Sequence, residues 1–470
     1  MIDILLGMIL AQLLWSVLIL LLPKGRSSML AKAGAAVTMV LTAAVAYLYF
    51  TAGAASLSSS YAYSSSLGIA AGFQLNEVTL ILIVMTSVIF FAASFVGDYF
   101  IGRNDKLYNF LFAFMEATSL GVFLSSSLIF FYVFWEVTEI AMFFIILLYG
   151  GIDRKYAAIK FLIYSIISSL LLLIGIMALY HYSAAQSFSI QAVISSGISA
   201  PAYMQALIFL VLLIAFMIKV PVFPFHTWLP AAHTEAPATG SMILAGVMLK
   251  FGAYGLLLLF SIMSPITAFA APYLAILFAF SSIYGAFTAI KMSNLKRMVA
   301  YTSIADMGIV SFAMVALNQA GTIGAAYGML SHGIAISLLF MLAGTFDKEF
   351  GTLQIERLGG ILRWSAPAAY LFIFGIFAVI GIPLTAGFIA DVLMFIGSTS
   401  TFGILGIAPL LSIVIVGAYL LWLAERSILG GRQSIEGLTE SFDRSVRNSA
   451  LVLASAAVIL GVLPFLLLSI

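Results

Sequence analysis

Apolar residues fill the chain in stretches of about 20, the length that an α-helix needs to cross the hydrocarbon of a bilayer. Counting along the sequence gives fourteen such stretches, numbered here as spans 1 to 14. The pattern therefore predicts an all-α polytopic membrane protein with about 14 transmembrane helices. The spans lie approximately at 2-22, 29-54, 75-97, 107-124, 126-149, 156-182, 203-222, 238-262, 269-290, 297-317, 321-345, 366-395, 404-427 and 448-469.

Lysine and arginine are distributed unequally over the connections between these spans. Connections after odd-numbered spans carry basic residues, whereas those after even-numbered spans carry none. By the positive-inside rule, the odd connections are cytoplasmic and both termini lie outside. The connection after span 7 has His226, His233 and Glu235 in place of basic residues, so we expect it to fold partly back into the protein. The basic residues of the odd connections are Lys24, Arg26, Lys32, Arg103, Lys106, Arg154, Lys155, Lys160, Lys291, Lys296, Arg297, Lys348, Arg357, Arg363, Arg426, Arg432, Arg444 and Arg447.

Two spans contain a proline that interrupts the helix. Span 7 breaks at Pro221 and span 12 at Pro383, because proline removes a backbone donor. About five spans separate the breaks, which predicts two five-helix repeats of opposite orientation, with sites at the corresponding broken helices. The predicted divisions are 1-106 for helices 1 to 3, 107-262 for the first repeat, 269-427 for the second, inverted repeat, and 428-470 for a cytoplasmic loop and helix 14.

Composition excludes several classes of protein. The chain is 63% hydrophobic and only 8% charged, whereas soluble domains are about 25% charged. Basic residues are dispersed, so there is no patch for nucleic acid. No cysteine is present, which excludes disulfides, thiolate metal sites and iron-sulfur ligation within this chain.

Two lysines, Lys219 and Lys250, lie in the middle of apolar runs. A charged side chain at the bilayer centre costs about 2.5 to 3.5 kcal/mol even on mild scales, so such a residue needs a partner and a function. An ammonium group held out of water releases its proton more readily, and a nearby carboxylate opposes this, which suits proton transfer. Glu136 and Glu139 are three residues apart and share a helix face, so one can pair with Lys219 while the other takes up protons. The other ionisable residues at membrane depth are Glu116, Asp306, His332 and Asp391.

Structural explanations compete with this hypothesis for single residues. Glu116 or His332 can simply hydrogen-bond neighbouring helices, and Asp306 can form an interfacial ion pair with a basic residue near the start of its helix. Two histidines seven residues apart, His226 and His233, are weak evidence for metal, so we predict no metal site. The whole set, spread over spans 5, 7, 8, 10 and 12, favours a proton path.

Five stretches of the chain resemble the antiporter-like membrane subunits of respiratory complex I. The similarity is greatest to the M-type subunit, called subunit 4 in mitochondria, because of the pattern HTWLP-x-AH-x-EAP-x-x-GS-x-ILAG-x-x-LK. The stretches are FFYVFWEVTEIAMFFII (130-146), KVPVFPFHTWLPAAHTEAPATGSMILAGVMLKFGAYGL (219-256), NLKRMVAYTSIADMGIV (294-310), MLSHGIAISLLF (329-340) and GIPLTAGFIADVLMF (381-395).

The resemblance implies a role for particular residues. Carried over by position, it puts the proton-translocating groups at Glu136, Lys219, Lys250, His332 and Asp391. Together they would form a hydrated row at mid-membrane. Separating Glu136 from Lys219 would then push a proton along this row toward Asp391.

Other residues are possible relays or departures from the family pattern. Glu139, His226, His233 and Asp306 are possible relays. Asp306 stands where the family often has histidine, and Ala231 where it usually has aspartate.

The predicted function is a proton-translocating membrane-arm subunit of a complex I-like NADH/quinone-type oxidoreductase. No redox centre or cofactor is expected in this chain, whereas partner subunits would hold FMN or another flavin, iron-sulfur clusters and quinone. The expected partners are other antiporter-like and small membrane subunits and, indirectly, the peripheral redox arm, in a prokaryotic plasma membrane. Alternatives are a subunit of a multi-subunit Na⁺/H⁺ antiporter or membrane-bound hydrogenase, and a scaffold that does not pump.

Overall fold

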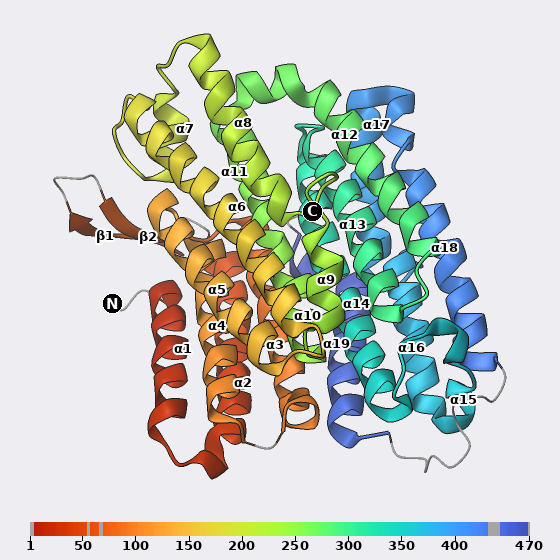
Figure 1. Ribbon diagram of the computed structural model, residues 1–470. Coiled ribbons are helices and arrows are strands. Elements are labelled where there is room, and N and C mark those ends of the chain that lie inside the picture. The colour runs from red at the N-terminus through yellow and green to blue at the C-terminus, as the bar shows by residue number, and fades with distance from the viewer. Residues whose placement is uncertain (1–3, 54–56, 65–68, 103, 431–441, 469–470) are drawn as a thin grey trace.

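The computed structural model describes residues 4–53, 57–64, 69–102, 104–430 and 442–468. Arg103, Arg432 and most of the predicted loop after residue 428 lie outside these ranges. The described chain is a bundle of long helices that run side by side (Figure 1). Thirteen of these helices are long and apolar enough to cross a membrane.

The first half of the chain supplies helices α1 to α11. Predicted spans 1 to 8 all correspond to helices, with ends that shift by a few residues. The helices are α1 (Ile4–Leu21), α2 (Ser27–Ala52), α3 (Glu77–Phe100), α4 (Lys106–Leu124), α5 (Leu128–Tyr149), α6 (Arg154–Tyr182), α7 (Ile190–Ser196), α8 (Ala202–Lys219), α9 (Trp228–Glu235), α10 (Ala238–Ile243), the π-helical turn η4 (Leu244–Met248) and α11 (Leu249–Ile262).

The second half supplies the remaining spans. Span 10 is α13, which lies outside the thirteen apolar helices and carries Lys296, Arg297 and Asp306, yet it is mostly buried and packs against α12 and α14. The helices are α12 (Ser264–Ile290), α13 (Leu295–Met314), α14 (Gln319–Phe350), α15 (Ile361–Trp364), α16 (Ala366–Ile380), α17 (Ala386–Phe402), α18 (Leu410–Ala424) and α19 (Arg444–Val462). Helix α14 is the centre of the bundle, because 94% of its apolar window is buried.

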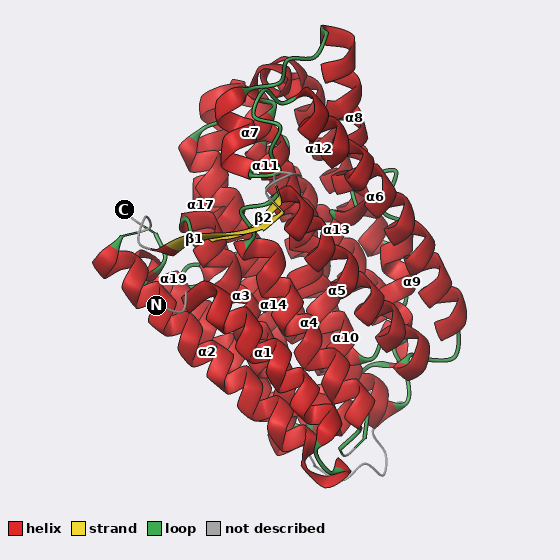
Figure 2. Ribbon diagram, turned by 90° about the vertical axis from the view of Figure 1, so that its left-hand side faces the viewer, coloured by secondary structure: helices red, strands yellow, loops and turns green. Residues whose placement is uncertain are grey.

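A β-hairpin interrupts the helical pattern between α2 and α3. Strands β1 (Ser58–Ser64) and β2 (Ile69–Gln74) pair antiparallel and project from one side of the bundle (Figures 1 and 2). A backbone hydrogen bond of 2.9 Å from Ser126 to Gly72 ties the hairpin to the start of α5. This hairpin departs from the all-α expectation, since the segment is short and rich in serine and alanine rather than in the residues typical of strands.

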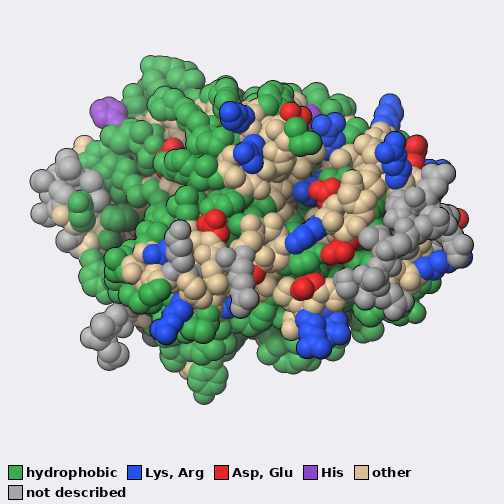
Figure 3. Space-filling model, turned by 60° about the horizontal axis from the view of Figure 1, so that its bottom comes forward, with side chains coloured by type: hydrophobic (Ala, Val, Ile, Leu, Met, Phe, Trp, Pro, Cys, Tyr) green, Lys and Arg blue, Asp and Glu red, His purple; other side chains and the backbone are tan. Residues whose placement is uncertain are grey.

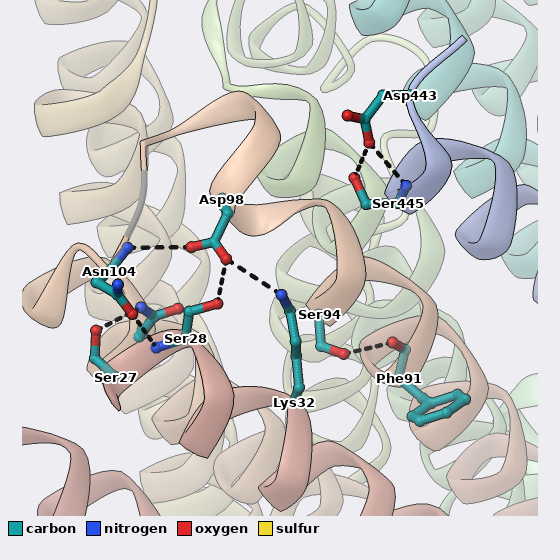
Figure 4. A network of polar contacts seen from close by, with 10 residues as sticks. Ser27, Ser28, Lys32, Phe91, Ser94, Asp98, Asn104, Asp443 and Ser445 are labelled. Atoms are coloured by element: carbon teal, nitrogen blue, oxygen red, sulfur yellow. Dashed lines mark hydrogen bonds and ion pairs between the residues drawn. The ribbon is translucent and has the colours of Figure 1, made fainter. Parts of the chain in front are cut away.

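The odd-numbered connections gather on one face, as their charges predict. Lys32, near the start of α2, pairs with Asp98, near the end of α3, at 3.2 Å (Figure 4). Lys106 donates to the carbonyl of Leu20 at 2.6 Å, and Lys348 contacts Tyr99. Lysine and arginine side chains stand among acidic ones on this basic face (Figure 3).

Both predicted helix breaks are present. Helix α8 ends at Lys219, and the segment that follows folds back as α9, whose Trp228 and His233 are buried. The second break lies between α16 and α17, where Gly381 adopts a φ of 77° and ends α16. Helix α17 runs on to Phe402, seven residues beyond the predicted end of span 12 at Phe395.

Candidate functional site

Lys219 is the last residue of α8 and forms a buried ion pair with α5. Its Nζ lies 2.5 Å from Oε1 of Glu139, and both side chains are only 2% exposed. The position at a helix C-terminus favours a cation, because the free carbonyl ends carry partial negative charge. The rings of Trp135, Phe161 and Trp228 lie within 5.2 to 5.9 Å of the ammonium nitrogen and exclude water around it.

Glu136 does not form this ion pair. It lies on the same helix, three residues before Glu139, and is partly exposed. Its Oε2 atom is buried and has no hydrogen-bond partner. The second carboxylate oxygen of Glu139 accepts a hydrogen bond of 3.4 Å from Ser169 of α6, which fixes the paired acid in place. The structure therefore distinguishes the two glutamates: Glu139 is paired with Lys219, whereas Glu136 has an oxygen without a partner.

Lys250 is completely buried and contacts His332 of α14. Its Nζ lies 2.7 Å from Nδ1 of His332 and donates to the carbonyl oxygen of Ala245 at 2.7 Å. Ala245 belongs to η4, one turn before the lysine. Wide π-helical turns inside helices disturb the regular hydrogen bonding and are frequent at functional sites. This turn lets Lys250 donate to the carbonyl of Ala245 in its own helix while it also contacts His332 of α14.

Two glycines allow α14 to approach η4 closely at this point. A Cβ atom on Gly333 would lie 2.7 Å from the carbonyl oxygen of Gly246 and 2.8 Å from Sδ of Met85. Ser337, one turn further on α14, donates a hydrogen bond of 3.0 Å to the carbonyl of Met242. Small residues and short interhelical hydrogen bonds bring membrane helices together. The close approach places His332 within reach of Lys250.

Beyond His332, a small cavity joins two acids from different helices. Asp306 of α13 and Asp391 of α17 both line it, together with Ser331 and His332. The cavity has room of about 30 Å³, and a water molecule needs about 10 to 15 Å³ on such a measure. One or two water molecules can therefore connect the histidine with the acids. Neither carboxylate has a hydrogen-bond or ion-pair partner among the described residues.

The two histidines near the first break have separate surroundings. His226 packs against the rings of Phe223, Tyr284 and Tyr301. His233 is fully buried, stacks on Phe340 at 4.3 Å, and has no partner at either ring nitrogen. The described residues contain no group of three or more histidine, cysteine, aspartate or glutamate side chains that is arranged to hold a metal ion.

A larger cavity opens near His233 on the basic face. It has a volume of about 440 Å³ and is lined by Glu235, Lys296 and Asp347. The ends of α3, α5 and α14 and the start of α13 meet around it. His233 lies close enough to Lys296 and Lys250 for both charges to act on it. The histidine thus lies near both Lys296, which lines this cavity, and the buried Lys250.

Glu116 lies apart from the other ionisable residues. It is fully buried between α1, α2 and α4, and its Oε2 accepts a hydrogen bond of 2.5 Å from Nε2 of Gln12. It lines neither of the two cavities described above. This arrangement fits the interhelical hydrogen bond that the sequence analysis offered as the alternative to a proton-carrying role.

Sequence reasoning did not find two parts of this site. The carbonyl of Ala245 at the π turn has no signature in the residue pattern. The choice of Glu139 over Glu136 depends on which face of α5 is buried, and α5 is too apolar all round to show that face. The only available signal is the spacing of Phe131, Trp135 and Glu139, which are buried at intervals of four residues.

The chain is similar in sequence to known membrane subunits of oxidoreductases. The transmembrane family described as NADH:quinone oxidoreductase/Mrp antiporter matches residues 125–416. Chain 4 1 of the NAD(P)H-quinone oxidoreductase of Synechococcus sp. strain JA-2-3B'a(2-13) is 34% identical over 417 residues, which cover 86% of this chain and 78% of the relative. Subunit M of the NADH-quinone oxidoreductase of Rickettsia felis is 33% identical over 371 residues, 79% of this chain and 75% of the relative.

A solved structure has the same fold. A chain of respiratory complex I from Thermus thermophilus with bound NADH superposes with a TM-score of 0.88 at 25% identity. The alignment covers 98% of this chain and 96% of the other. The two relatives named above are subunits of quinone oxidoreductases. The fold shared with the Thermus thermophilus chain extends over nearly the whole of this chain.

Proposed function

The chain belongs to the NADH:quinone oxidoreductase/Mrp antiporter transmembrane family, and from that premise we propose that it is a proton-translocating subunit in the membrane arm of a complex I-like oxidoreductase. The observation that carries this proposal is the order of the buried groups. The pair Lys219–Glu139, the pair Lys250–His332 and the cavity of Asp306 and Asp391 follow one another through the bundle.

The first step would take place at Lys219. In the structure, Glu139 lies 2.5 Å from Lys219 and supplies the negative charge that the ammonium pairs with. Moving that carboxylate away removes the attraction, and the surrounding aromatic rings offer no replacement acceptor. Lys219 would then release its proton toward Lys250, while Glu136 supplies the next proton. The charges of Lys219 and Glu139 attract each other strongly because the local dielectric is low.

The second step would use Lys250 and His332 as a direct relay. A distance of 2.7 Å between Nζ and Nδ1 is short enough for proton transfer without water. The proton then reaches the acids across the small cavity beyond the histidine. Neutral histidine suits this place, since one ring nitrogen accepts while the other donates.

Entry and exit would use opposite faces. The 440 Å³ cavity on the basic face, followed by His233, supports uptake toward Lys250. Asp391 also lines a second small cavity with Ser398, Gly406 and Pro409, which lie around the connection between α17 and α18. That connection follows an even-numbered span, so it belongs to the face opposite the basic one. We assign uptake to the cytoplasmic side and release to the outside.

Redox chemistry would occur elsewhere in the complex. We propose that flavin, iron-sulfur clusters and quinone are held by partner subunits, since this chain has no cysteine to ligate a cluster. Its neighbours would be further antiporter-like subunits and small membrane subunits, in a prokaryotic plasma membrane with both termini outside. The membrane itself follows from the thirteen apolar helices.

A second candidate function is cation/proton exchange within an Mrp-type antiporter. The description of the matching family, which names both kinds of complex, supports it. In that case the same row would carry protons, but the driving force would be an ion gradient instead of electron transfer.

The test is Lys219→Ala in the assembled complex, measured in sealed membrane vesicles. We expect electron transfer to continue while the number of protons pumped per electron falls severely. Lys155→Ala is the matched control, because that lysine is exposed on the basic face. Pumping at wild-type stoichiometry in the Lys219 variant would overturn the proposal and favour a scaffold.

A further inference from the structure

A further large cavity, called the outer cavity here, opens on the face opposite the basic one. It has a volume of about 330 Å³ and lies between the start of α3, the second half of α11, the end of α13 and the start of α14. These helix ends adjoin connections after even-numbered spans, which carry no lysine or arginine. None of the residues of the proposed proton row lines the outer cavity. It is open to that side, because exposed residues form its rim, namely Asn76, Ser261, Ser264 and Leu317.

Tyr254 is the deepest residue of α11 in the outer cavity. Helix α11 runs from the buried Lys250 toward this face, and its lining residues extend from Tyr254 to Ser261. The hydroxyl of Tyr254 has no hydrogen-bond partner among the described residues, yet it is not one of their fully enclosed polar atoms that lack a partner. The 5% of this side chain that is exposed therefore includes the hydroxyl. Water that enters the outer cavity would reach as far as this group.

Lys250 lies one helical turn deeper than Tyr254. Residues four apart on a helix share a face, and a tyrosine side chain leans back toward the preceding turn of its helix, which here contains Lys250. The ammonium of Lys250 points away from Tyr254, because it contacts the carbonyl of Ala245 and Nδ1 of His332. The outer cavity thus ends one turn from the buried lysine, without a hydrogen bond that links Tyr254 to it among the described residues.

Aromatic rings fill the space around Tyr254. The centre of its ring lies 5.9 Å from that of Phe123 and 6.1 Å from that of Phe131. Phe123 also contacts Phe251, the residue after Lys250, at 5.3 Å. All four of these aromatic residues are buried. Packed rings leave no room for a chain of water molecules, and apolar constrictions close channels in this way by excluding water.

Lys250 needs a closed outer side, because it is also approached from the basic face. His233 lies near Lys250 and near Lys296, which lines the 440 Å³ cavity on that face. A proton site that is open to both faces at once would let protons flow back down their gradient. Transporters avoid this leak by opening to one side at a time.

We propose that Tyr254 is the outer seal of the proton row: its ring, packed on Phe123 and Phe131, separates the outer cavity from Lys250 and prevents a proton leak. The inference rests on the proposed function, because it concerns the same buried lysine. The ring forms the barrier, and the hydroxyl only faces the outer cavity. Tyr254 therefore carries no proton itself.

The first experiment measures passive proton flux into sealed vesicles that contain the assembled complex, under an imposed pH gradient and without an electron donor. Tyr254→Ala removes the ring and should raise the flux several-fold above that of the wild type. Tyr254→Phe keeps the ring and should leave the flux at the wild-type level. Tyr108→Ala is the matched control, because Tyr108 is a similarly buried tyrosine at the basic-face end of α4, and it should not raise the flux.

The second experiment measures access to the outer cavity. This chain has no cysteine, so a single introduced thiol, detected on this chain after the subunits are separated, reports its own exposure to a membrane-impermeant maleimide added on the outer side. Thr322→Cys places the thiol in the outer cavity and should react. Thr118→Cys is the matched control, because Thr118 is buried in α4 and does not line the outer cavity, so it should not react. An unreactive Thr322→Cys would overturn both the open cavity and the seal.

A wild-type proton flux in Tyr254→Ala would overturn the inference. So would a leak in Tyr254→Phe as large as that in Tyr254→Ala, because the ring would then not be the barrier. Tight Tyr254→Phe vesicles that have lost pumping would also contradict it and would show that the hydroxyl carries protons. Should Tyr254→Ala fail to assemble, Tyr254→Leu leaves a smaller gap, for which a smaller rise in flux is expected and a wild-type flux overturns the seal.

The pumping of Lys219→Ala tests the proton row independently of this seal. Lost pumping in Lys219→Ala together with a tight Tyr254→Ala refutes only the seal. Undiminished pumping in Lys219→Ala together with a leaking Tyr254→Ala refutes only the proposed proton row.

Discussion

Lys219 and Glu139 form an ion pair of 2.5 Å in the interior of the bundle, and Glu136, three residues earlier on the same helix, takes no part in it. Two acids on one helix thus have different positions relative to the same lysine. One has a fixed charged partner, and the other has a free oxygen and reaches the surface of this chain.

This difference predicts unequal effects of replacing each acid by its amide. Glu139→Gln leaves the Lys219 ammonium buried without a counter-charge, a change that costs about 3 to 5 kcal/mol for buried pairs. We therefore expect Glu139→Gln to reduce proton pumping more strongly than Glu136→Gln. Pumping and electron transfer in sealed vesicles measure the effect. A larger loss of pumping in Glu136→Gln would contradict this prediction and show that proton supply by Glu136 limits pumping more than the Lys219–Glu139 pair does.

The contact between Lys250 and His332 predicts the effect of removing the histidine. His332→Ala leaves the lysine with only the carbonyl of Ala245 and opens a gap before the cavity. We expect pumping to fall by about tenfold or more while the complex still assembles. His181→Ala is the matched control, since His181 lies at the exposed end of α6 and should leave pumping unchanged. Normal pumping in His332→Ala would show that protons reach the acids by another route.

The close approach of α14 to η4 predicts that Gly333→Ala is harmful. Its new methyl group would lie 2.7 Å from the carbonyl oxygen of Gly246, so the helices must separate and the Lys250–His332 contact must lengthen. We expect a loss of stability of about 1 to 3 kcal/mol and weaker pumping. Thermal unfolding of the purified complex measures the first effect. Gly25→Ala, where nothing lies within 4 Å, should change neither property.

The second helix break predicts a specific role for Gly381. Its φ of 77° is unfavourable for any residue with a Cβ atom, and that atom would collide with the carboxylate of Asp391. Gly381→Ala should therefore cost about 1 to 2 kcal/mol of backbone strain and also displace Asp391, so pumping falls. Gly351→Ala stands in the same left-handed region, at a φ of 65° with nothing within 4 Å, so it should show the backbone cost alone. Equal pumping in the two variants would remove the role of Gly381 at the acid.

The sequence alone determined where this chain crosses the membrane and where its helices break. Span positions follow from runs of about 20 apolar residues, which is a local property of the chain. The breaks follow from Pro221 and Pro383, since a missing N–H has its effect at the residue itself. The alternation of basic connections likewise predicted that they share one face, and the contacts among α2, α3 and α14 confirm this.

The same logic identified the buried ionisable residues but not their partners. Lys219, Lys250 and Asp391 each lie inside an apolar span, where a charged side chain is costly. The span alone shows this, so these residues stand out in the sequence. The family pattern pointed to Glu136, whereas the structure pairs Lys219 with Glu139. The hairpin of β1 and β2 and the π turn beside Lys250 also had no sequence signal.

Only the tertiary structure decided which groups meet. Membrane helices are apolar on lipid-facing and core-facing sides alike, so the sequence gives little indication of how each helix is rotated. That rotation is decided by packing between distant segments, such as Gly333 against Gly246 or α8 against α5. The rotation of each helix decides which side chains come within 3 Å of each other. It therefore also decides the order of the groups along the proposed proton path.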